Sequence, residues 1–257
     1  MITIKRIQRF PIKGLSPEGL DNVTLHPGEG VPGDRMYGFA RHGSGFDPEN
    51  PKPLPKDRFV VLLNQAGLAG VHSTFSPDTS ELSVVAGGAK HVFDMSAKPG
   101  RDSAAAWLAD HLKLQDEIPP NFVSAAPHRF TDVSVVSPQM MNAISIINRA
   151  SVRDLEVRLG TKVDPARFRG NLELDGLPPW WELENIDAIL QMGDVKLQLI
   201  MRTKRCAATE VNPTTAERDL RLPYLLRKEL GHMDMGAYAQ VIEGGILQVG
   251  QTVTCDV

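Results

Sequence analysis

The clearest chemical signal in this sequence is one cysteine, Cys206, which follows a basic cluster at the end of an apolar run. Residues 195–201 alternate apolar and polar side chains, which is typical of a β-strand. Arg202, Lys204 and Arg205 then lead into the cysteine. Nearby cations favour the thiolate form, which is both a nucleophile and a soft metal ligand. On these residues alone, a reactive or metal-ligating thiol and a buried structural cysteine both stay open.

Other familiar catalytic motifs are missing from the sequence. The seven histidines are scattered, and neither a Cys-x-x-Cys nor a His-Glu-x-x-His motif accompanies them. There is also no Gly-rich phosphate loop, no nucleophile elbow and no local signature of a cysteine protease. The sequence therefore gives poor support to a zinc centre or a hydrolase, and Cys206 stays the main candidate.

Three further cations, Lys13, Arg35 and Arg169, each lie in or follow a turn rich in glycine or proline next to an expected strand. Taken singly, each is most simply a solvated surface charge. Phosphate recognition needs such cations, and arginine suits it through its forked guanidinium. Only a shared site would give all three a common role.

Composition restricts the class of protein. The chain has 257 residues, 42% hydrophobic residues and a net charge of −3, which is typical of a folded globular protein and gives no reason to expect nucleic acid or a membrane as partner. Its two cysteines, Cys206 and Cys255, do not form a disulfide framework, so we expect free thiols. No signal-peptide core and no run of about 18 apolar residues occurs. We therefore predict a cytoplasmic protein.

Many short strands with few helices between them predict a mainly β chain with helices (α+β), built as a β-barrel and not as a parallel α/β sheet. Pro119 and Pro120 mark the expected boundary between domains 1–120 and 121–257. The patterns also predict helices at 104–112, 139–149 and 151–159, a strand at 133–136, and hairpins that turn at 87–88 and 244–245.

Four motifs occur in an order that is specific as a set. They are Phe10-Pro11-Ile12-Lys13-Gly14, Gly33-Asp34-Arg35, Arg167-Phe168-Arg169-Gly170-Asn171 and the segment 204–213 around Cys206. Together they resemble the MOSC-domain proteins that carry an N-terminal MOSC β-barrel domain, the group that includes the mitochondrial amidoxime-reducing component. The resemblance extends over essentially the whole chain.

The resemblance implies an N-terminal MOSC-associated β-barrel-like domain, a β-barrel MOSC domain and a site for the molybdenum cofactor (Mo-molybdopterin) in the cleft between them. Cys206 matches the cysteine that coordinates molybdenum and so would be the catalytic and metal-binding residue. The matching cofactor-binding positions, several of them for the pterin phosphate, are Lys13, Arg35, Arg169, Asn171, Arg205 and Thr209.

By the same resemblance, we expect an oxidoreductase that reduces N-hydroxylated (N-oxygenated) small molecules. No cysteine-rich ferredoxin segment and no membrane anchor is visible, so the electrons would come from a separate donor protein with flavin, heme or iron-sulfur groups. The alternatives are a molybdenum cofactor carrier or sulfur-transfer protein with a persulfide on Cys206, and a binding module without a redox role. Glu210 and Asn212 depart from the usual family pattern and leave the substrate open.

Two segments are candidates for the rim of a substrate opening. Residues 41–56 contain several glycines and prolines and predict a long irregular loop, which is often functional or mobile. Trp180 and Trp181 lie in another loop, where a packed aromatic pair is the simpler interpretation.

Overall fold

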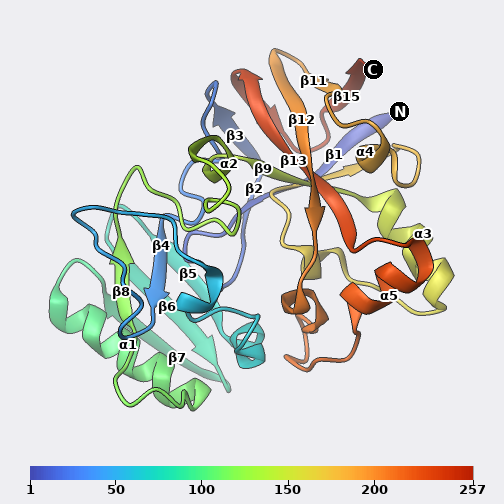
Figure 1. Cartoon of the computed structure of the whole chain (residues 1–257). Helices are drawn as coiled ribbons and strands as arrows, with labels where there is room; N and C mark the ends of the chain where they lie inside the picture. The colour runs from blue at the N-terminus through green and yellow to red at the C-terminus, as the bar shows by residue number, and fades with distance from the viewer. Residues whose placement is uncertain (257) are drawn as a thin grey trace.

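The computed structural model of this protein describes residues 1–256, which form two lobes joined along one side (Figure 1). The first half of the chain supplies most of the small lobe, with strands β4–β8 and helix α1, whereas the second half supplies most of the barrel lobe. The strands are β1 (Ile2–Arg9), β2 (Glu18–Leu20), β3 (Asn22–Leu25), β4 (Tyr37–Ala40), β5 (His72–Ser76), β6 (Glu81–Ala86), β7 (Ala89–Asp94), β8 (Asn121–Ser124), β9 (Ile144–Asn148), β10 (Leu172–Asp175), β11 (Ile189–Met192), β12 (Val195–Lys204), β13 (Asp234–Glu243), β14 (Gly245–Gln248) and β15 (Thr252–Asp256). The helices are α1 (Lys98–Leu112), α2 (Pro138–Met141), α3 (Arg149–Leu159), α4 (Trp181–Glu184) and α5 (Leu222–Leu230).

The barrel lobe is a ring of strands in the order β10-β9-β13-β12-β11-β15-β1, which closes because β1 also pairs with β10. Its neighbouring strands are antiparallel except β9 and β10, where Leu172 faces Ile146 in parallel register. Alternate residues of β12 turn inward, and Val195 and Leu197 are fully buried among the other barrel side chains. This alternation is what a strand with one solvated face requires. The predicted mainly β (α+β) fold with a β-barrel is confirmed.

The first strand, β1, belongs to the barrel lobe, although the expected boundary would assign it to the N-terminal domain. β1 pairs with β10 from Thr3–Asp175 to Ile7–Leu172 and contributes Ile4 and Ile7 to the barrel core. The division into domains 1–120 and 121–257 stays a prediction, and residues from both sides of it build the barrel.

The small lobe contains the sheet β5-β6-β7, the strand pair β4–β8 and helix α1. Leu108 of α1 packs with Leu82 and Val84 of β6 in a separate apolar cluster. The predicted hairpin of β6 and β7, with its turn at Gly87 and Gly88, is confirmed, as are the predicted helices within α1 and α3. This lobe therefore has its own core and presents its loops to the barrel.

Two predictions for residues 133–149 are wrong. The predicted helix 139–149 is limited to α2, and Ile144–Asn148 is the buried strand β9 between β10 and β13. A short apolar run has the same pattern in a buried strand as in a buried helix, and here the strand neighbours decide. The predicted strand 133–136 is a series of turns, with Val135 and Val136 exposed.

The predicted hairpin at Gly244 and Gly245 is also wrong. After β13 the chain changes partner, and β14 pairs with β3 through Ile246–Thr24 and Leu247–Val23. A Cβ on Gly244 would lie 2.6 Å from the backbone oxygen of Leu25, so glycine permits this close approach. The double glycine thus redirects a strand instead of reversing it.

Helix α4 is attached to the barrel by a buried carboxyl group, Glu182. Its Oε2 accepts hydrogen bonds from Asn148 Nδ2 at 2.9 Å and from Ser151 Oγ at 3.0 Å. Burial raises the pKa of Glu182 above its ordinary value of 4.5. The folded state therefore binds this proton more tightly than the unfolded state, and stability decreases as pH rises from 4.5 through the raised pKa.

We expect Glu182→Gln to remove this part of the pH dependence. The difference between the free energies of unfolding of the variant and the wild type should increase in favour of the variant as pH rises from about 4 towards neutrality. Over this range the wild-type carboxyl must ionise while it is buried, and the amide of the variant does not. Urea unfolding at a series of pH values measures the difference. The control is Glu184→Gln on the exposed face of the same helix. An equal change of slope in both variants would contradict the explanation.

No helix within residues 1–256 is both long and apolar enough to span a membrane.

Candidate functional site

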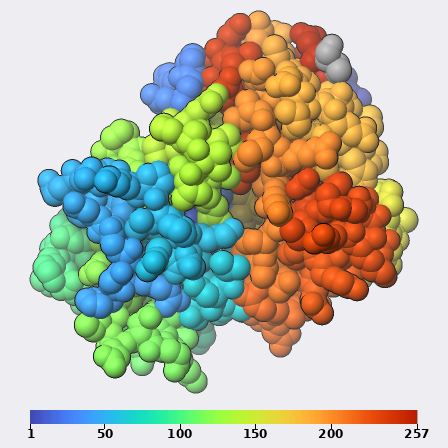
Figure 2. Space-filling view, in the orientation of Figure 1, coloured from blue at the N-terminus to red at the C-terminus, as the bar shows by residue number. Residues whose placement is uncertain are grey.

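A cavity of about 350 Å³ lies where the two lobes meet, and it is lined by residues from both. In the space-filling view, the surface is hollowed where the cyan segment of the small lobe faces the orange segment of the barrel (Figure 2). Every residue predicted from the sequence to form the site lines this cavity: Lys13, Arg35, Arg169, Asn171, Arg205, Cys206 and Thr209. Residues as far apart in the chain as Lys13 and Thr209 therefore line the same cavity, while their functional roles stay predictions.

Cys206 stands two residues after the end of β12 and directly before a 3-10 turn at Ala207–Glu210. The Thr209 amide and hydroxyl both donate to the Cys206 carbonyl, at 3.0 and 2.9 Å. The cysteine is partly buried and unpaired. Thr209 thus shapes the turn through the cysteine backbone and leaves the thiol free on the cavity wall.

Arg205, the first residue after β12, is buried. Its Nη1 donates to the Phe168 carbonyl at 2.9 Å, and its Nε donates to the Met235 carbonyl at 2.8 Å. Burial lowers the pKa of Arg205 to about 10. Within residues 1–256, no carboxylate forms an ion pair with it. Backbone carbonyls therefore orient this cation without neutralising it, and the charge can act on an anion in the cavity.

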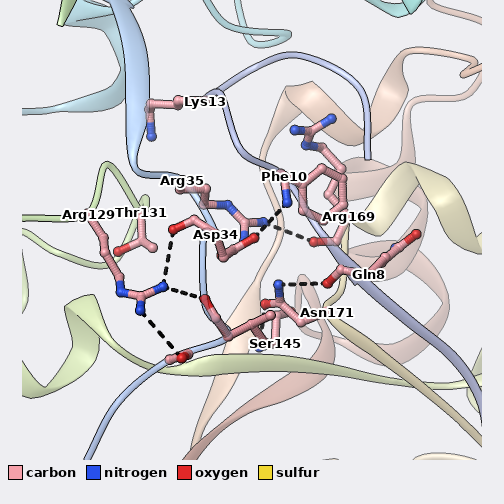
Figure 3. A network of polar contacts seen from close by, with 12 residues as sticks. Gln8, Phe10, Lys13, Asp34, Arg35, Arg129, Thr131, Ser145, Arg169 and Asn171 are labelled. Atoms are coloured by element: carbon pink, nitrogen blue, oxygen red, sulfur yellow. Dashed lines mark hydrogen bonds and ion pairs between the residues drawn. The ribbon is translucent and has the colours of Figure 1, made fainter. Parts of the chain in front are cut away.

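Arg35 and Arg169 approach each other across the ring of Phe10 (Figure 3). Their guanidinium carbons lie 4.6 and 4.1 Å from the ring centroid, within the range of a cation–π contact. Arg35 pairs with Asp34 at 2.5 Å and donates to the Arg169 carbonyl at 3.1 Å. Arg169 donates to the Leu15 carbonyl at 2.8 Å.

The electrostatics of these two arginines differ. Burial alone would lower the pKa of Arg35. The charge of Asp34 and its hydrogen bond to Arg35 together have the larger effect, so the pKa of Arg35 is raised. Burial, followed by repulsion from Arg35, lowers the pKa of Arg169 to about 9.

Arg35 and Arg169 both have φ of +50°, a left-handed conformation that is uncommon outside glycine. Such strain is concentrated at functional sites, where surrounding contacts hold it.

An acidic residue that sequence reasoning missed, Asp132, connects two lysines across the cavity. Lys13 Nζ is ion-paired with Asp132 Oδ1 and donates to the Phe130 carbonyl at 2.8 Å. Lys56 Nζ lies 3.4 Å from Asp132 Oδ2 and 3.2 Å from Cys206 Sγ. Burial lowers the pKa of Lys13. Burial raises the pKa of Asp132, but Lys13 and Lys56 outweigh it and hold the pKa well below its usual range. Asp132 is thus a charged link between the lysines.

Asn171 lines the cavity, but its side chain is occupied by the scaffold. Its Nδ2 donates to the Gln8 carbonyl at 3.2 Å, and its Oδ1 accepts the Ser145 amide at 3.1 Å (Figure 3). These bonds connect the end of β1 to β9, the two strands that flank β10. The amide therefore positions the neighbouring Arg169 by keeping the two strands in place.

Two buried polar atoms on the cavity wall have no hydrogen-bond partner within the described residues, Arg167 Nε and Thr203 Oγ1. The other Arg167 nitrogens are engaged: Nη1 donates to the Glu210 carbonyl at 3.0 Å, and Nη2 donates to both Asp219 oxygens at 2.7 and 2.8 Å. An unpaired buried polar atom costs free energy unless a ligand or water satisfies it. Arg167 lies in one of the four motifs, whereas no local sequence signal pointed to Asp132.

The two candidate rim segments behave differently. The loop 41–56 reaches the cavity through its last residue, Lys56. Trp180 instead packs with the apolar cluster beneath α3 and α5, and Trp181 packs against the barrel core. Neither tryptophan lines the cavity, so the simpler interpretation of a packing pair describes them.

Comparison with known proteins places the barrel lobe in a family. The sequence profile of the MOSC domain matches residues 126–254, half of the chain. This chain belongs to the MOSC domain family. It is 26% identical over 183 residues to human "Mitochondrial amidoxime-reducing component 1", covering 63% of this chain and 54% of that one. It is also 28% identical over 160 residues to "Molybdenum cofactor sulfurase" of Drosophila persimilis, covering 60% and 20%.

This MOSC-domain chain spans about half the length of the amidoxime-reducing relatives that it matches. Among solved structures, it is similar to the YUAD protein of Bacillus subtilis over 98% of this chain and 94% of that one, with 12% identity and a TM-score of 0.44. A second similar structure is YiiM from Geobacillus stearothermophilus, with 18% identity, a TM-score of 0.35, and 44% and 54% of the two chains covered.

Proposed function

We propose that this MOSC-domain protein is a molybdenum-cofactor-dependent reductase of N-oxygenated small molecules. The observation that carries the proposal is the meeting of the Cys206 thiol with buried cations in one cavity between the lobes. The MOSC family match and the relatives named for amidoxime reduction and for the molybdenum cofactor support it. The cytoplasmic location and the absence of nucleic acid and membrane partners stay predictions from the sequence.

The residues present fit such a cofactor. A thiolate is a ligand suited to a soft metal centre, and Cys206 is partly exposed to the cavity. Arg35, Arg169 and Lys13 would hold the pterin phosphate, because forked guanidinium and ammonium groups are the usual phosphate donors. The unpartnered Arg167 Nε offers a further buried donor to an anionic or polar ligand. Arg205 would add positive charge to the wall of the cavity next to Cys206.

The proposed reaction consumes two electrons and two protons for each N–O bond. A hydroxylamine-type substrate R–NH–OH would become R–NH₂ with release of water. The cofactor, when bound, supplies the two-electron transfer to substrate. A separate protein with a flavin, heme or iron-sulfur group would supply the electrons. The chain itself would provide the thiolate, hold the anionic cofactor with its cations and admit substrate between the lobes.

We expect Cys206→Ser to abolish cofactor retention and N-reduction. Protein made in a host that synthesises the cofactor should contain close to one molybdenum and one pterin per chain, and the variant less than about a tenth of that, since it loses the metal–thiolate bond. Elemental analysis and fluorescence of the oxidised pterin measure the two contents. Turnover of an N-hydroxylated amidine with a reduced donor protein measures the activity.

The matched control is Cys255→Ser, which changes the other free thiol, far from the cavity on β15. It should keep wild-type contents of metal and pterin. Equal contents in the two variants would contradict the assignment of Cys206, and molybdenum-loaded wild-type protein that reduces no N-hydroxylated compound would contradict the reductase.

A second candidate function is sulfur transfer or cofactor delivery with a persulfide on Cys206. The match to a molybdenum cofactor sulfurase favours it, and Lys56 beside the sulfur would stabilise a persulfide anion as well as a thiolate. Cyanide-releasable sulfur distinguishes the two functions. One equivalent per chain that disappears in Cys206→Ser, in protein free of molybdenum, would support sulfur transfer and exclude the reductase.

A further inference from the structure

The side chain of Lys56 comes from the small lobe and reaches the thiol of the barrel lobe. It follows the proline-rich loop and begins a 3-10 turn at Lys56–Arg58. Its Nζ lies 3.2 Å from Cys206 Sγ, and its side chain is 31% exposed. Lys56 therefore places an ammonium group that is partly open to solvent directly beside the thiol.

Asp132 holds Lys56 in this position. Its Oδ2 lies 3.4 Å from Lys56 Nζ, while its other oxygen is ion-paired with the buried Lys13. The carboxylate is shared between two lysines, so it compensates only part of the Lys56 charge. The cation remains partly unpaired and oriented towards the sulfur.

The cavity has more positive charge than its own carboxylates neutralise. Eight lysine and arginine side chains line it, together with one carboxylate, Asp132. Asp34 and Asp219 neutralise Arg35 and Arg167 from behind. Lys204 is exposed at the cavity and has no ion pair or side-chain hydrogen bond within residues 1–256. This local excess occurs in a chain whose net charge is −3.

The cations form two groups that differ in depth. Arg205 is buried and Arg169 is partly buried, and both are bound to backbone carbonyls, so they suit a resident anion. Lys56 and Lys204 are reachable from solvent. The proposed cofactor would use the inner group, and the outer group would then face whatever enters the cavity next.

We propose that Lys56, with Lys204 on the opposite lobe, makes this site selective for N-oxygenated substrates that also carry a carboxylate. Lys56 is then a specificity-determining residue: it would bind the carboxylate and orient the N–O group within the cavity. This inference rests on the proposed reductase function. The carboxylate is bound and stays chemically unchanged.

The first test uses cofactor-free full-length protein and needs no turnover. Iodoacetate and iodoacetamide both alkylate a thiolate, with transfer of the carboxymethyl or carbamoylmethyl group to sulfur and departure of iodide. Iodoacetate is an anion, whereas iodoacetamide is neutral. Because both rates are proportional to the amount of thiolate, their ratio at one thiol does not depend on how much of that thiol is ionised. Peptide mass spectrometry follows Cys206 and Cys255 separately in the same sample.

We expect the iodoacetate-to-iodoacetamide ratio at Cys206 to exceed the ratio at Cys255 by about fivefold or more at low salt, from the size of a single charge interaction at contact distance. Lys56→Gln should lower the Cys206 ratio by about threefold to tenfold, and Lys56→Arg should restore it. The control Lys98→Gln, on exposed α1, should change neither ratio. Equal ratios at the two thiols, or an unchanged ratio in Lys56→Gln, would overturn the proposal.

The second test uses the cofactor-loaded protein with N-hydroxybenzamidine and its 4-carboxylate. The wild type should reduce the carboxylate with the lower KM, and Lys56→Gln should lose this preference mainly through KM. Reduction of both compounds without preference would overturn this proposal and leave the reductase standing. Reduction of neither would overturn the reductase, and this proposal with it.

Discussion

Protein with Arg169→Ala is expected to keep about a tenth or less of the wild-type cofactor through purification, since a hydrogen bond to a charged group contributes about 1.5–3 kcal/mol, or roughly tenfold to a hundredfold in affinity. Arg169 is partly buried at the cavity, and its guanidinium is oriented by the Leu15 carbonyl and the Phe10 ring. No carboxylate within residues 1–256 pairs with it. Its charge is therefore free for the phosphate that we assign to it. Molybdenum and pterin contents measure the loss.

Two further variants make this result specific. Arg169→Lys keeps the charge but loses the forked geometry, so it should retain an intermediate amount of cofactor. Arg153→Ala removes an exposed arginine of α3 that pairs with Asp175 at 2.6 Å, and it should keep the full amount. Urea unfolding of the cofactor-free proteins separates a folding defect from a binding defect. Wild-type cofactor content in Arg169→Ala would contradict the phosphate assignment.

The second large effect concerns stability, at a glycine behind Arg205. Gly236 has φ of +74°, and a Cβ there would lie 2.4 Å from the Ile146 oxygen and 2.8 Å from Ile147 Cδ1. The oxygen belongs to β9, which pairs with β13, so it cannot retreat without disturbing the barrel. We expect Gly236→Ala to lower the free energy of unfolding by about 3–4 kcal/mol, from the left-handed conformation and the overpacking together.

Gly231→Ala is the matched control for this effect. Gly231 also has a left-handed φ, +80°, but a Cβ there would meet no atom within 4 Å. Its cost should be about 1–2 kcal/mol, from the backbone conformation alone. Urea unfolding at neutral pH measures both variants. Equal losses would show that the contact with β9 is not what makes alanine costly at position 236.

The resemblance to the MOSC-domain proteins predicts the inner wall of the cavity, because the residues that carry it lie in short motifs. Arg205, Cys206 and Thr209 come from one continuous segment that follows a strand with clear alternation. Lys13, Arg35 and Arg169 stand in turns next to strands, and the structure brings all three into the same cavity. Strand alternation and turn chemistry depend on nearest neighbours in the chain, so the sequence carries them directly.

Other features depended on partners that are remote in the chain. β9 was predicted as a helix because its apolar run suits either element, and only β10 and β13 on its two sides select the strand. β14 was predicted in a hairpin, but it pairs with β3, more than 200 residues earlier. Strand pairing is a long-range choice that a local pattern of alternation does not specify.

The charges around the sulfur show the same division. The sequence by itself determined that this protein has a cysteine after a basic strand end, and a mainly β fold to hold it. Only the tertiary structure placed Lys56 at 3.2 Å from the Cys206 sulfur and Asp132 between Lys56 and Lys13. These contacts join loops from two lobes. An ion pair across such a distance in the chain leaves no local signal, because its geometry exists only once the barrel has closed and the lobes have met.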